Sequence, residues 1–231
     1  MRRSLLTIFA FGAIGLMLAA LVADRVAPPD IARAERRSTV VLDASGEMLR
    51  AYLAEDDSWR LPVTAADVDQ RYLRLLIAYE DQRFHDHPGI DAFAVGRAIW
   101  QLFSNMRVVS GASTLTMQTA RLLTPGPRGL GAKLEQMARA LQLETRYSKE
   151  QILDLYLMLA PFGGNIEGVR AASLSYFGKE PRQLTLAEAA LLVALPQSPE
   201  RLRPDRHPQA ARAGRDRVLQ VLHERGAIGA E

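Results

Sequence analysis

The feature that most constrains the fold is a helix-start signal that recurs along the second part of the chain. Three capping boxes place a hydroxyl residue three positions before a side chain that can bond back to it: Thr64–Asp67, Ser148–Gln151 and Thr185–Glu188. After the first box, apolar residues recur at the spacing of a helix face, at positions 68, 72, 75, 76 and 79. Prolines at 125, 161 and 196 then interrupt the pattern. The sequence therefore predicts one mainly α-helical domain.

The remaining elements follow from the same signals. We expect Asp91 to cap a helix through Trp100, and Ser113 to cap another through about Leu123. Further helices are expected over about 132–146, from 148 to Pro161, from 164 or 165 to about 177, from 185 to Pro196, and over 209–225. The only β-structure expected is a hairpin with strands Thr39–Leu42 and Met48–Leu53 around a turn at 43–46.

Composition limits the classes of function. The chain has 231 residues, of which 48% are hydrophobic, enough for one good-sized domain plus an appendage. A net charge of +3, without arginine-rich runs, does not indicate nucleic-acid binding. The absence of cysteine excludes disulfides, thiolate zinc sites and cysteine nucleophiles. His85 and His87 form an H-x-H pair with no third ligand nearby, so we predict no metal site.

The N-terminal part reads as a membrane anchor. Residues 4–23 carry no charge, and a helix of about 20 residues spans about 30 Å, one hydrocarbon core. Arg2 and Arg3 precede it, which predicts a cytoplasmic N-terminus of residues 1–3 and an exported remainder. A linker over 24–38 and a domain over 39–231 follow. The alternative is a cleaved signal peptide, for which Leu21 before Ala23 is a poor cleavage context. In both cases the chain beyond Asp24 lies outside the cytoplasmic membrane.

The segment Glu80–Gly89 carries the strongest catalytic signal. Glu80 and Asp81 are adjacent carboxylates at the predicted end of a helix, where the negative end of the helix dipole favours the protonated form. A carboxyl group held near neutral pH can transfer a proton. The following Pro88 and Gly89 favour an ordered loop that can form the wall of a cleft. A solvated acidic pair at a helix end is the alternative.

A second polar constellation follows Gly111. In a helix, Thr114, Gln118 and Arg121 share one stripe, which offers a hydroxyl, an amide and a guanidinium to sugar hydroxyls and phosphate oxygens. Lys133 and Gln136 are neighbours on the next predicted helix, and Lys133 is a candidate phosphate partner. Ordinary solvent-facing polar residues are the alternative at both places. For the glycine-rich loop 161–168 we favour a structural turn over a part of the cleft.

In order and spacing, five segments resemble the peptidoglycan glycosyltransferases, the modules of class A penicillin-binding proteins and of monofunctional cell-wall polymerases. The segments are Glu80–Gly89, Gly111–Gln118, Gln151–Leu157, Ala171–Lys179 and Leu184–Pro199, and the resemblance covers about residues 38–213. The loop 161–168 and the region 195–208 look most similar to the penicillin-binding protein C subtype. Five motifs in order are a specific signal.

The resemblance implies a lysozyme-like helical fold and polymerisation of lipid II into glycan strands, with inversion and release of undecaprenyl diphosphate. It makes Glu80 the general base on the acceptor hydroxyl. The residues implied in substrate binding are Asp81, Phe84, His87, Ser113, Thr114, Gln118, Arg121, Lys133 and Gln136. The expected partners are lipid II, the nascent glycan strand, the cytoplasmic membrane and cell-wall synthesis or division proteins. No cofactor is implied beyond stimulation by a divalent cation, Mg²⁺ or Mn²⁺, in some family members.

Two departures from the family pattern leave alternatives open. The signature Arg-Lys-x-x-Glu reads Ala132-Lys133-Leu134-Glu135-Gln136 here, which casts doubt on any mechanism with two carboxylates. Neither the Ser-x-x-Lys nor the Lys-Thr-Gly motif of a transpeptidase occurs, so the sequence fits a monofunctional enzyme, a truncated product or a fragment. A lipid II-binding scaffold and a lytic, lysozyme-like enzyme are the competing functions.

Overall fold

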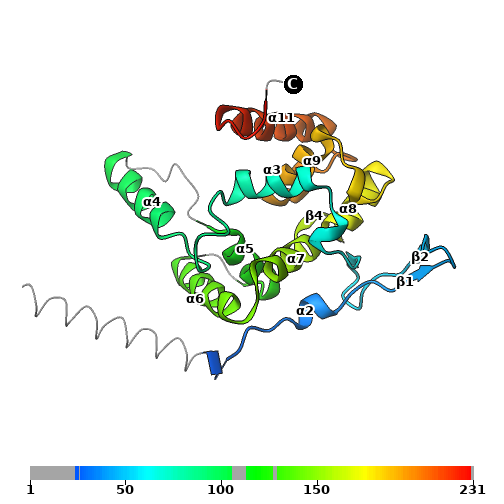
Figure 1. Ribbon diagram of the computed structural model, residues 1–231, viewed down its shortest axis with the longest axis horizontal. Coiled ribbons are helices and arrows are strands. Elements are labelled where there is room, and N and C mark those ends of the chain that lie inside the picture. Colours follow the sequence, from blue (N-terminus) through cyan, green and yellow to red (C-terminus); the bar gives the residue numbers. More distant parts are fainter. Residues whose placement is uncertain (1–23, 26, 106–112, 127–128, 230–231) are drawn as a thin grey trace, which may run out of the picture.

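The computed structural model of the protein describes residues 24–25, 27–105, 113–126 and 129–229 (Figure 1). Within these ranges, no helix is both long enough and apolar enough to cross a membrane. The predicted anchor at 4–23 lies outside the described residues, as does Gly111 of the second motif. The anchor therefore stays a prediction. The mainly α-helical architecture is confirmed.

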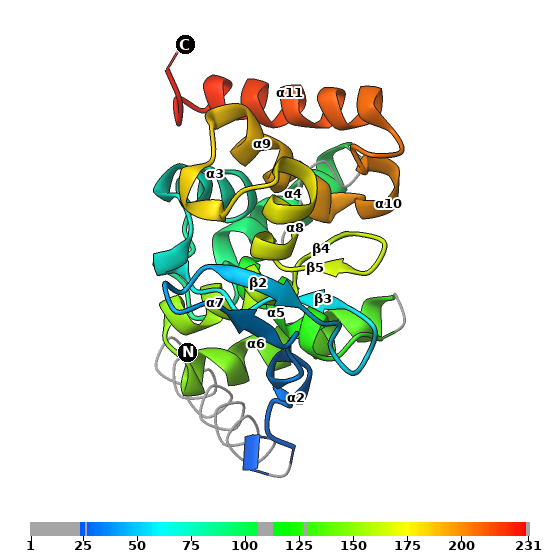
Figure 2. The same cartoon turned by 90° about the vertical axis from the view of Figure 1, so that its right-hand side faces the viewer.

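Two groups of helices form the body of the molecule (Figure 2). In each group the helices pack on one another; the first consists of α3 (Gln70–Glu80), α9 (Leu186–Ala194) and α11 (Pro208–Glu224), and the second of α5 (Leu115–Leu123), α6 (Leu130–Arg146) and α7 (Lys149–Leu159). Helix α8 (Val169–Phe177) packs against α7 and α9 and so joins the two groups. Helix α4 (Ala92–Asn105) lies at the edge of the molecule (Figure 1).

One hydrophobic core runs through both groups. The apolar stripe of α3 buries Tyr72 and Leu76 completely, and Leu157 and Ile152 of α7 are equally buried in the same cluster. Burial of such side chains stabilises each by about 1.5–3 kcal/mol relative to exposure. The predicted stripe is therefore the face that attaches α3 to the rest of the domain.

Two small sheets accompany the helices. The predicted hairpin is confirmed, with β1 (Val40–Leu42) antiparallel to β2 (Met48–Ala51). A second, three-stranded sheet was not predicted; it has the order β3 (Trp59–Arg60), β5 (Ile166–Glu167), β4 (Pro161–Gly163). The expectation that a helix opens at 164 or 165 is wrong, because β5 occupies this stretch and α8 begins only after Gly168, whose φ is +84°.

Two of the predicted caps lie elsewhere than expected. The Thr64–Asp67 box forms, but it caps the 3-10 turn η1 (Ala65–Asp67), and α3 instead begins after Asp69. Thr114, not Ser113, caps α5 and accepts from the backbone N–H of Met117 at 3.1 Å. The boxes at Ser148 and Thr185 are confirmed, as is Asp91 before α4.

The remaining short helical elements are α2 (Ala32–Glu35), η2 (Pro181–Gln183), η3 (Leu195–Gln197) and α10 (Pro199–Leu202).

Candidate functional site

Glu80 lies where the two helix groups meet. It is the last residue of α3, and its carboxylate accepts from two side-chain amides: Gln118 Nε2 reaches Oε2 at 2.9 Å, and Gln197 Nε2 reaches Oε1 at 2.9 Å. Gln118 comes from α5 in the other group, and Gln197 from η3 after α9. A carboxylate oxygen has two acceptor positions, so each oxygen can still accept a further proton donor. The amides fix the orientation of the carboxylate and leave it able to act as a base.

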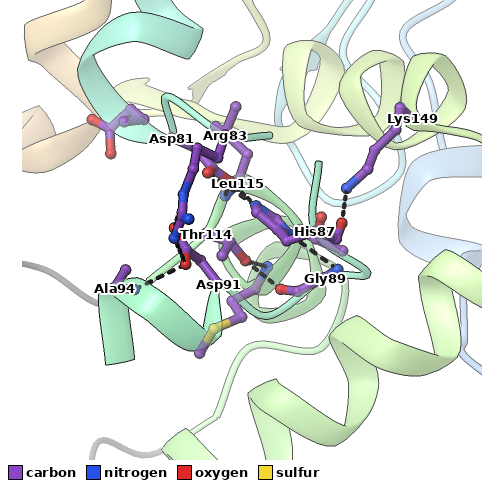
Figure 3. Close-up of polar contacts among 12 residues, drawn as sticks. Asp81, Arg83, His87, Gly89, Asp91, Ala94, Thr114, Leu115 and Lys149 are labelled. Carbon is purple, nitrogen blue, oxygen red and sulfur yellow. Dashed lines mark hydrogen bonds and ion pairs between the residues drawn. The ribbon is translucent and has the colours of Figure 1, made fainter. Parts of the chain in front are cut away.

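Asp81, the residue after Glu80, forms a buried pair with His87 (Figure 3). His87 Nε2 lies 3.0 Å from both carboxylate oxygens of Asp81, and the backbone N–H of Gly89 donates to His87 Nδ1 at 3.2 Å. Because Nδ1 accepts, the ring proton lies on Nε2 and is donated to Asp81. Asp81 Oδ2 also accepts from the backbone N–H of Leu115 at 2.9 Å. The pair therefore ties the loop after α3 to the start of α5.

The two sequence motifs are joined by a second contact. Thr114 is 2% exposed, and its hydroxyl donates to the carbonyl of Gly89 at 2.6 Å (Figure 3). Gly89 has φ +90°, and a Cβ there would lie 2.9 Å from the carbonyl oxygen of Ala140. Thr114 thus supports the loop as well as capping α5, and its side chain is not part of an open polar stripe with Gln118 and Arg121.

A further set of residues, which the sequence reasoning missed, supports the loop from outside. Lys149 donates to the carbonyl of His87 at 2.7 Å and to Glu144 Oε1 at 2.7 Å, and its ammonium lies 4.6 Å from the ring centre of Phe84. Phe84 is completely buried. Glu144 also accepts from the hydroxyl of Thr116 at 2.6 Å. The i, i+5 relation of Glu144 and Lys149 across a helix break carried no signal of this role.

A cavity of about 660 Å³ opens beside Glu80; we call it the carboxylate cavity. Its charged lining includes Asp91, which the guanidinium of Arg83 contacts (Figure 3). Burial raises the pKa of Asp91, but the N–H of Ala94 and the charge of Arg83 outweigh it, and the net pKa is lowered. The other arginines of this lining, for which the described residues provide no ion pair, are Arg97, Arg217 and Arg225.

A second cavity, of about 570 Å³, holds the predicted cations; we call it the cationic cavity. Arg121, Lys133 and Gln136 line it together. Lys133 donates to the hydroxyl of Ser113, and its pKa is lowered by burial and, to a smaller extent, by the charge of Arg121. A partly buried ammonium group beside a guanidinium group is suited to an anionic ligand, because the anion compensates both positive charges. Gln197, which donates to Glu80, lines both cavities.

The two histidines of the H-x-H pair do not face a common point. His85 is exposed and packs edge-on against Phe84, while both ring nitrogens of His87 are engaged within the chain. Among the residues that the structure describes, no group of three or more histidine, aspartate and glutamate side chains is placed to hold a metal ion.

The chemistry available is a base next to an anion site. A fixed carboxylate can accept a proton from a hydroxyl in the carboxylate cavity, and two cations in the neighbouring cavity can stabilise a departing anion. Glu80, Gln118, Arg121, Lys133 and Gln136 contribute their side chains to this arrangement. Asp81 and Thr114 also line the carboxylate cavity, as does Ser113, which contacts Lys133. With Phe84 and His87, Asp81 and Thr114 also build the loop and helix start that hold the site.

Comparison with known proteins places the chain among transglycosylases. The family model described as "Transglycosylase" matches residues 45–223. Penicillin-binding protein 1C of Escherichia coli strain K12 is 49% identical over 216 residues, which are 94% of this chain and 28% of that protein. Penicillin-binding protein 1F of Bacillus subtilis strain 168 is 34% identical over 195 residues, 84% of this chain and 27% of that protein.

Among solved structures, the crystal structure of penicillin-binding protein 1A from Haemophilus influenzae matches 84% of this chain and 19% of that one, with a TM-score of 0.44 and 22% identity. The chain spans little more than a quarter of the length of the two curated relatives named above.

Proposed function

Since the chain belongs to the transglycosylase family, we propose that it is a peptidoglycan glycosyltransferase that polymerises lipid II, with Glu80 as the general base. The observation that carries the proposal is the carboxylate of Glu80 held at both oxygens by Gln118 and Gln197, beside the cationic cavity. Transfer of a sugar from a diphosphate to a hydroxyl requires a base that takes the hydroxyl proton and a neighbouring site that binds the departing diphosphate.

The side chains that line the two cavities are sufficient for the proposed glycosyl transfer. Glu80 takes the proton of the acceptor 4-hydroxyl, and this oxygen attacks the anomeric carbon of the growing strand from the face opposite the leaving group. The new glycosidic bond forms as the bond to the lipid diphosphate breaks, and the diphosphate leaves with the electron pair. Arg121 and Lys133 neutralise its charge, so the leaving group needs no proton from a second carboxyl. Gln136, which stands where the family has an acid, is compatible with this role.

The substrate sites follow from the two cavities. We place the acceptor in the carboxylate cavity and the donor diphosphate in the cationic cavity, with Gln197 at their junction. A lipid-linked substrate also suits a chain held in the bacterial cytoplasmic membrane by residues 4–23, with the domain on the outer side. These placements, the lysozyme-like fold and any cell-wall or division partner are parts of the proposal. A divalent cation that stimulates the reaction would bind the diphosphate of the substrate.

The test is polymerisation of lipid II by the purified, detergent-solubilised chain. Glu80→Gln is expected to lower the rate by about 10²–10⁴-fold, the usual contribution of a general base. Glu135→Gln is the matched control, because Glu135 is an exposed carboxylate on α6 and lines neither cavity. Glycan strands from the wild type and the control, but not from Glu80→Gln, support the proposal.

Two results would contradict it. Binding of lipid II without polymer, in a folded wild-type sample, would favour a scaffold. Shortened, soluble glycans released from polymer would favour a lytic enzyme.

A further inference from the structure

The segment before the matched family region contributes a residue to the cationic cavity. Residues 31–36 precede position 45, where the family match begins, and fall within the part expected to be a linker. The structure folds them against the domain: α2 packs on α5 and α7, and Ala34 is buried in the main core. This packing brings Arg33 to the wall of the cationic cavity, where its side chain is 22% exposed.

Arg33 spans two walls of that cavity. Its Nη2 donates to Glu167 Oε1 at 2.5 Å, and its Nη1 donates to the carbonyl of Leu122, next to Arg121 in the chain. Glu167 belongs to β5 and lines the cavity too. Arg33 therefore connects the end of α5, which carries one cation of the cavity, to the central strand of the second sheet.

The other oxygen of Glu167 is occupied by a different arginine. Arg60, completely buried, donates to Glu167 Oε2 from Nε at 2.9 Å and from Nη2 at 2.5 Å. Arg60 also pairs with Asp56 at 2.8 Å. The cluster thus holds two guanidinium groups and two carboxylates, and its net charge is zero.

The charge balance of this cluster affects the electrostatic potential in the cationic cavity. With Arg33 and Arg60 both present, Glu167 adds no uncompensated negative charge, and Arg121 and Lys133 set the potential. Without Arg33, Arg60 balances only one of the two carboxylates, and one negative charge stays at the cavity wall. Charges inside a partly enclosed cavity interact more strongly than charges in bulk water. A single uncompensated carboxylate there opposes the binding of a phosphate group.

We infer that Arg33 is a positioning residue of the anion site: by neutralising Glu167, it keeps the cationic cavity able to bind a diphosphate. The identity of the ligand rests on the proposed function. The inference makes the segment 31–36 a part of the substrate site, although it lies outside the matched family region.

The experiment measures binding of inorganic diphosphate to the detergent-solubilised full chain by calorimetry, so the readout does not depend on activity. Arg33→Ala is expected to weaken binding by about threefold to tenfold. Arg33→Ala combined with Glu167→Gln is expected to restore binding to within about twofold of the wild type, because the cluster is again neutral. Arg33→Lys, which keeps the charge, is expected to bind like the wild type.

The double variant separates charge from structure. A purely structural role predicts that removing a second partner weakens the site further, so binding no better than in Arg33→Ala would overturn the inference, as would unchanged binding in Arg33→Ala. Arg36→Ala is the matched control, since Arg36 is an exposed arginine of the same segment that does not line the cavity. Absence of diphosphate binding in the wild type also overturns the inference, whereas polymerisation of lipid II by the same sample tests the proposed function separately.

Discussion

The side-chain amide of Gln197 donates to Glu80 Oε1 at 2.9 Å, across 117 positions of sequence. With Gln118 on the other oxygen, the carboxylate is held from both helix groups at once. Its orientation therefore depends on how the two groups are packed against each other. A substitution that shifts the two helix groups relative to one another is therefore expected to change the orientation of the Glu80 carboxylate, even where the substituted residue does not contact Glu80.

Replacing Gln197 tests this dependence directly. Gln197→Ala removes one of the two donors and is expected to lower the rate of lipid II polymerisation about tenfold, because a base gains much of its effect from orientation. Gln197→Glu is expected to cost more, since it places a second negative charge beside Glu80. Steady-state rates and thermal melting give the comparison, with Gln183→Ala as control, because Gln183 is an exposed residue of η2. A rate for Gln197→Ala equal to that of the wild type would show that the second donor is dispensable.

The depressed pKa of Lys133 gives a pH signature to the anion site. Burial, and then the charge of Arg121, lower this pKa from 10.5, so Lys133 loses its charge at a lower pH than a free lysine. Diphosphate binding is expected to decline with rising pH already below pH 10.5, and Lys133→Arg is expected to abolish the decline because arginine stays charged. Equal slopes for the two proteins would contradict this assignment.

The contribution of Lys133 to the free energy of unfolding is expected to change with pH in the opposite direction to diphosphate binding. Between the lowered pKa of Lys133 in the folded chain and 10.5 in the unfolded chain, the unfolded state binds more protons. The contribution of Lys133 to the free energy of unfolding is therefore expected to rise with pH in that window. Urea titrations of the wild type and of Lys133→Met measure it as a difference in pH slope. A free energy of unfolding that rises more steeply with pH in Lys133→Met than in the wild type would contradict this prediction.

Gly89 allows a test of the loop that carries His87. Gly89→Ala combines a positive φ with a Cβ 2.9 Å from the carbonyl oxygen of Ala140, and is expected to lower the free energy of unfolding by about 2–4 kcal/mol. Gly46→Ala is a close control: φ is +86°, but nothing lies within 4 Å of the added carbon. Its cost should be about 1–2 kcal/mol, from backbone conformation alone. Urea denaturation compares them, and equal costs would mean that the close approach to α6 is relieved by a small shift.

Asp56 makes the arginine–carboxylate cluster sensitive to acid. Burial raises its pKa, but hydrogen bonds from Ser58 and Arg60 outweigh burial and lower the pKa from 3.8 to about 2. A lowered pKa in the folded state means that the stabilisation is present above about pH 4 and is lost as pH falls toward 2. Asp56→Asn is therefore expected to destabilise the chain more at pH 6 than at pH 2. Chemical denaturation at the two pH values measures this, and a cost that does not change with pH would argue against the ion pair.

Local signals in the sequence were enough to predict most helices. The boxes at Ser148 and Thr185 satisfy the helix starts within three residues, so nothing distant is needed to recognise them. Thr64 shows the limit of the same signal, because a box specifies a turn but not whether it continues as an α-helix. The sheet of β3, β5 and β4 was missed because its strands have two or three residues, too few to show alternation.

The residues of the candidate site also fall into those that local sequence motifs predict and those that depend on long-range packing. Glu80, Gln118 and Lys133 could be proposed from their motifs and spacing, and the structure brings Glu80 and Gln118 into contact. The contributions of Gln197 and Arg33 could not, because each depends on packing between segments more than 100 positions apart. Thr114 was assigned to an open stripe because helical spacing does not reveal which positions cap a helix from inside.

Helix α6 has a consequence for how far the site stands from its attachment. Near its N-terminal end it carries Lys133 of the cationic cavity; toward its C-terminal end, Arg139 and Arg146 bind the carbonyl of Ala27 at 2.7 Å and the carboxylate of Asp24 at 2.8 Å. Lys133 and Arg146 are 13 positions apart, which corresponds to about 20 Å along a helix. If residues 4–23 anchor the chain as proposed, a rigid rod and not a loose tether sets the spacing between the cations and the anchor's exit.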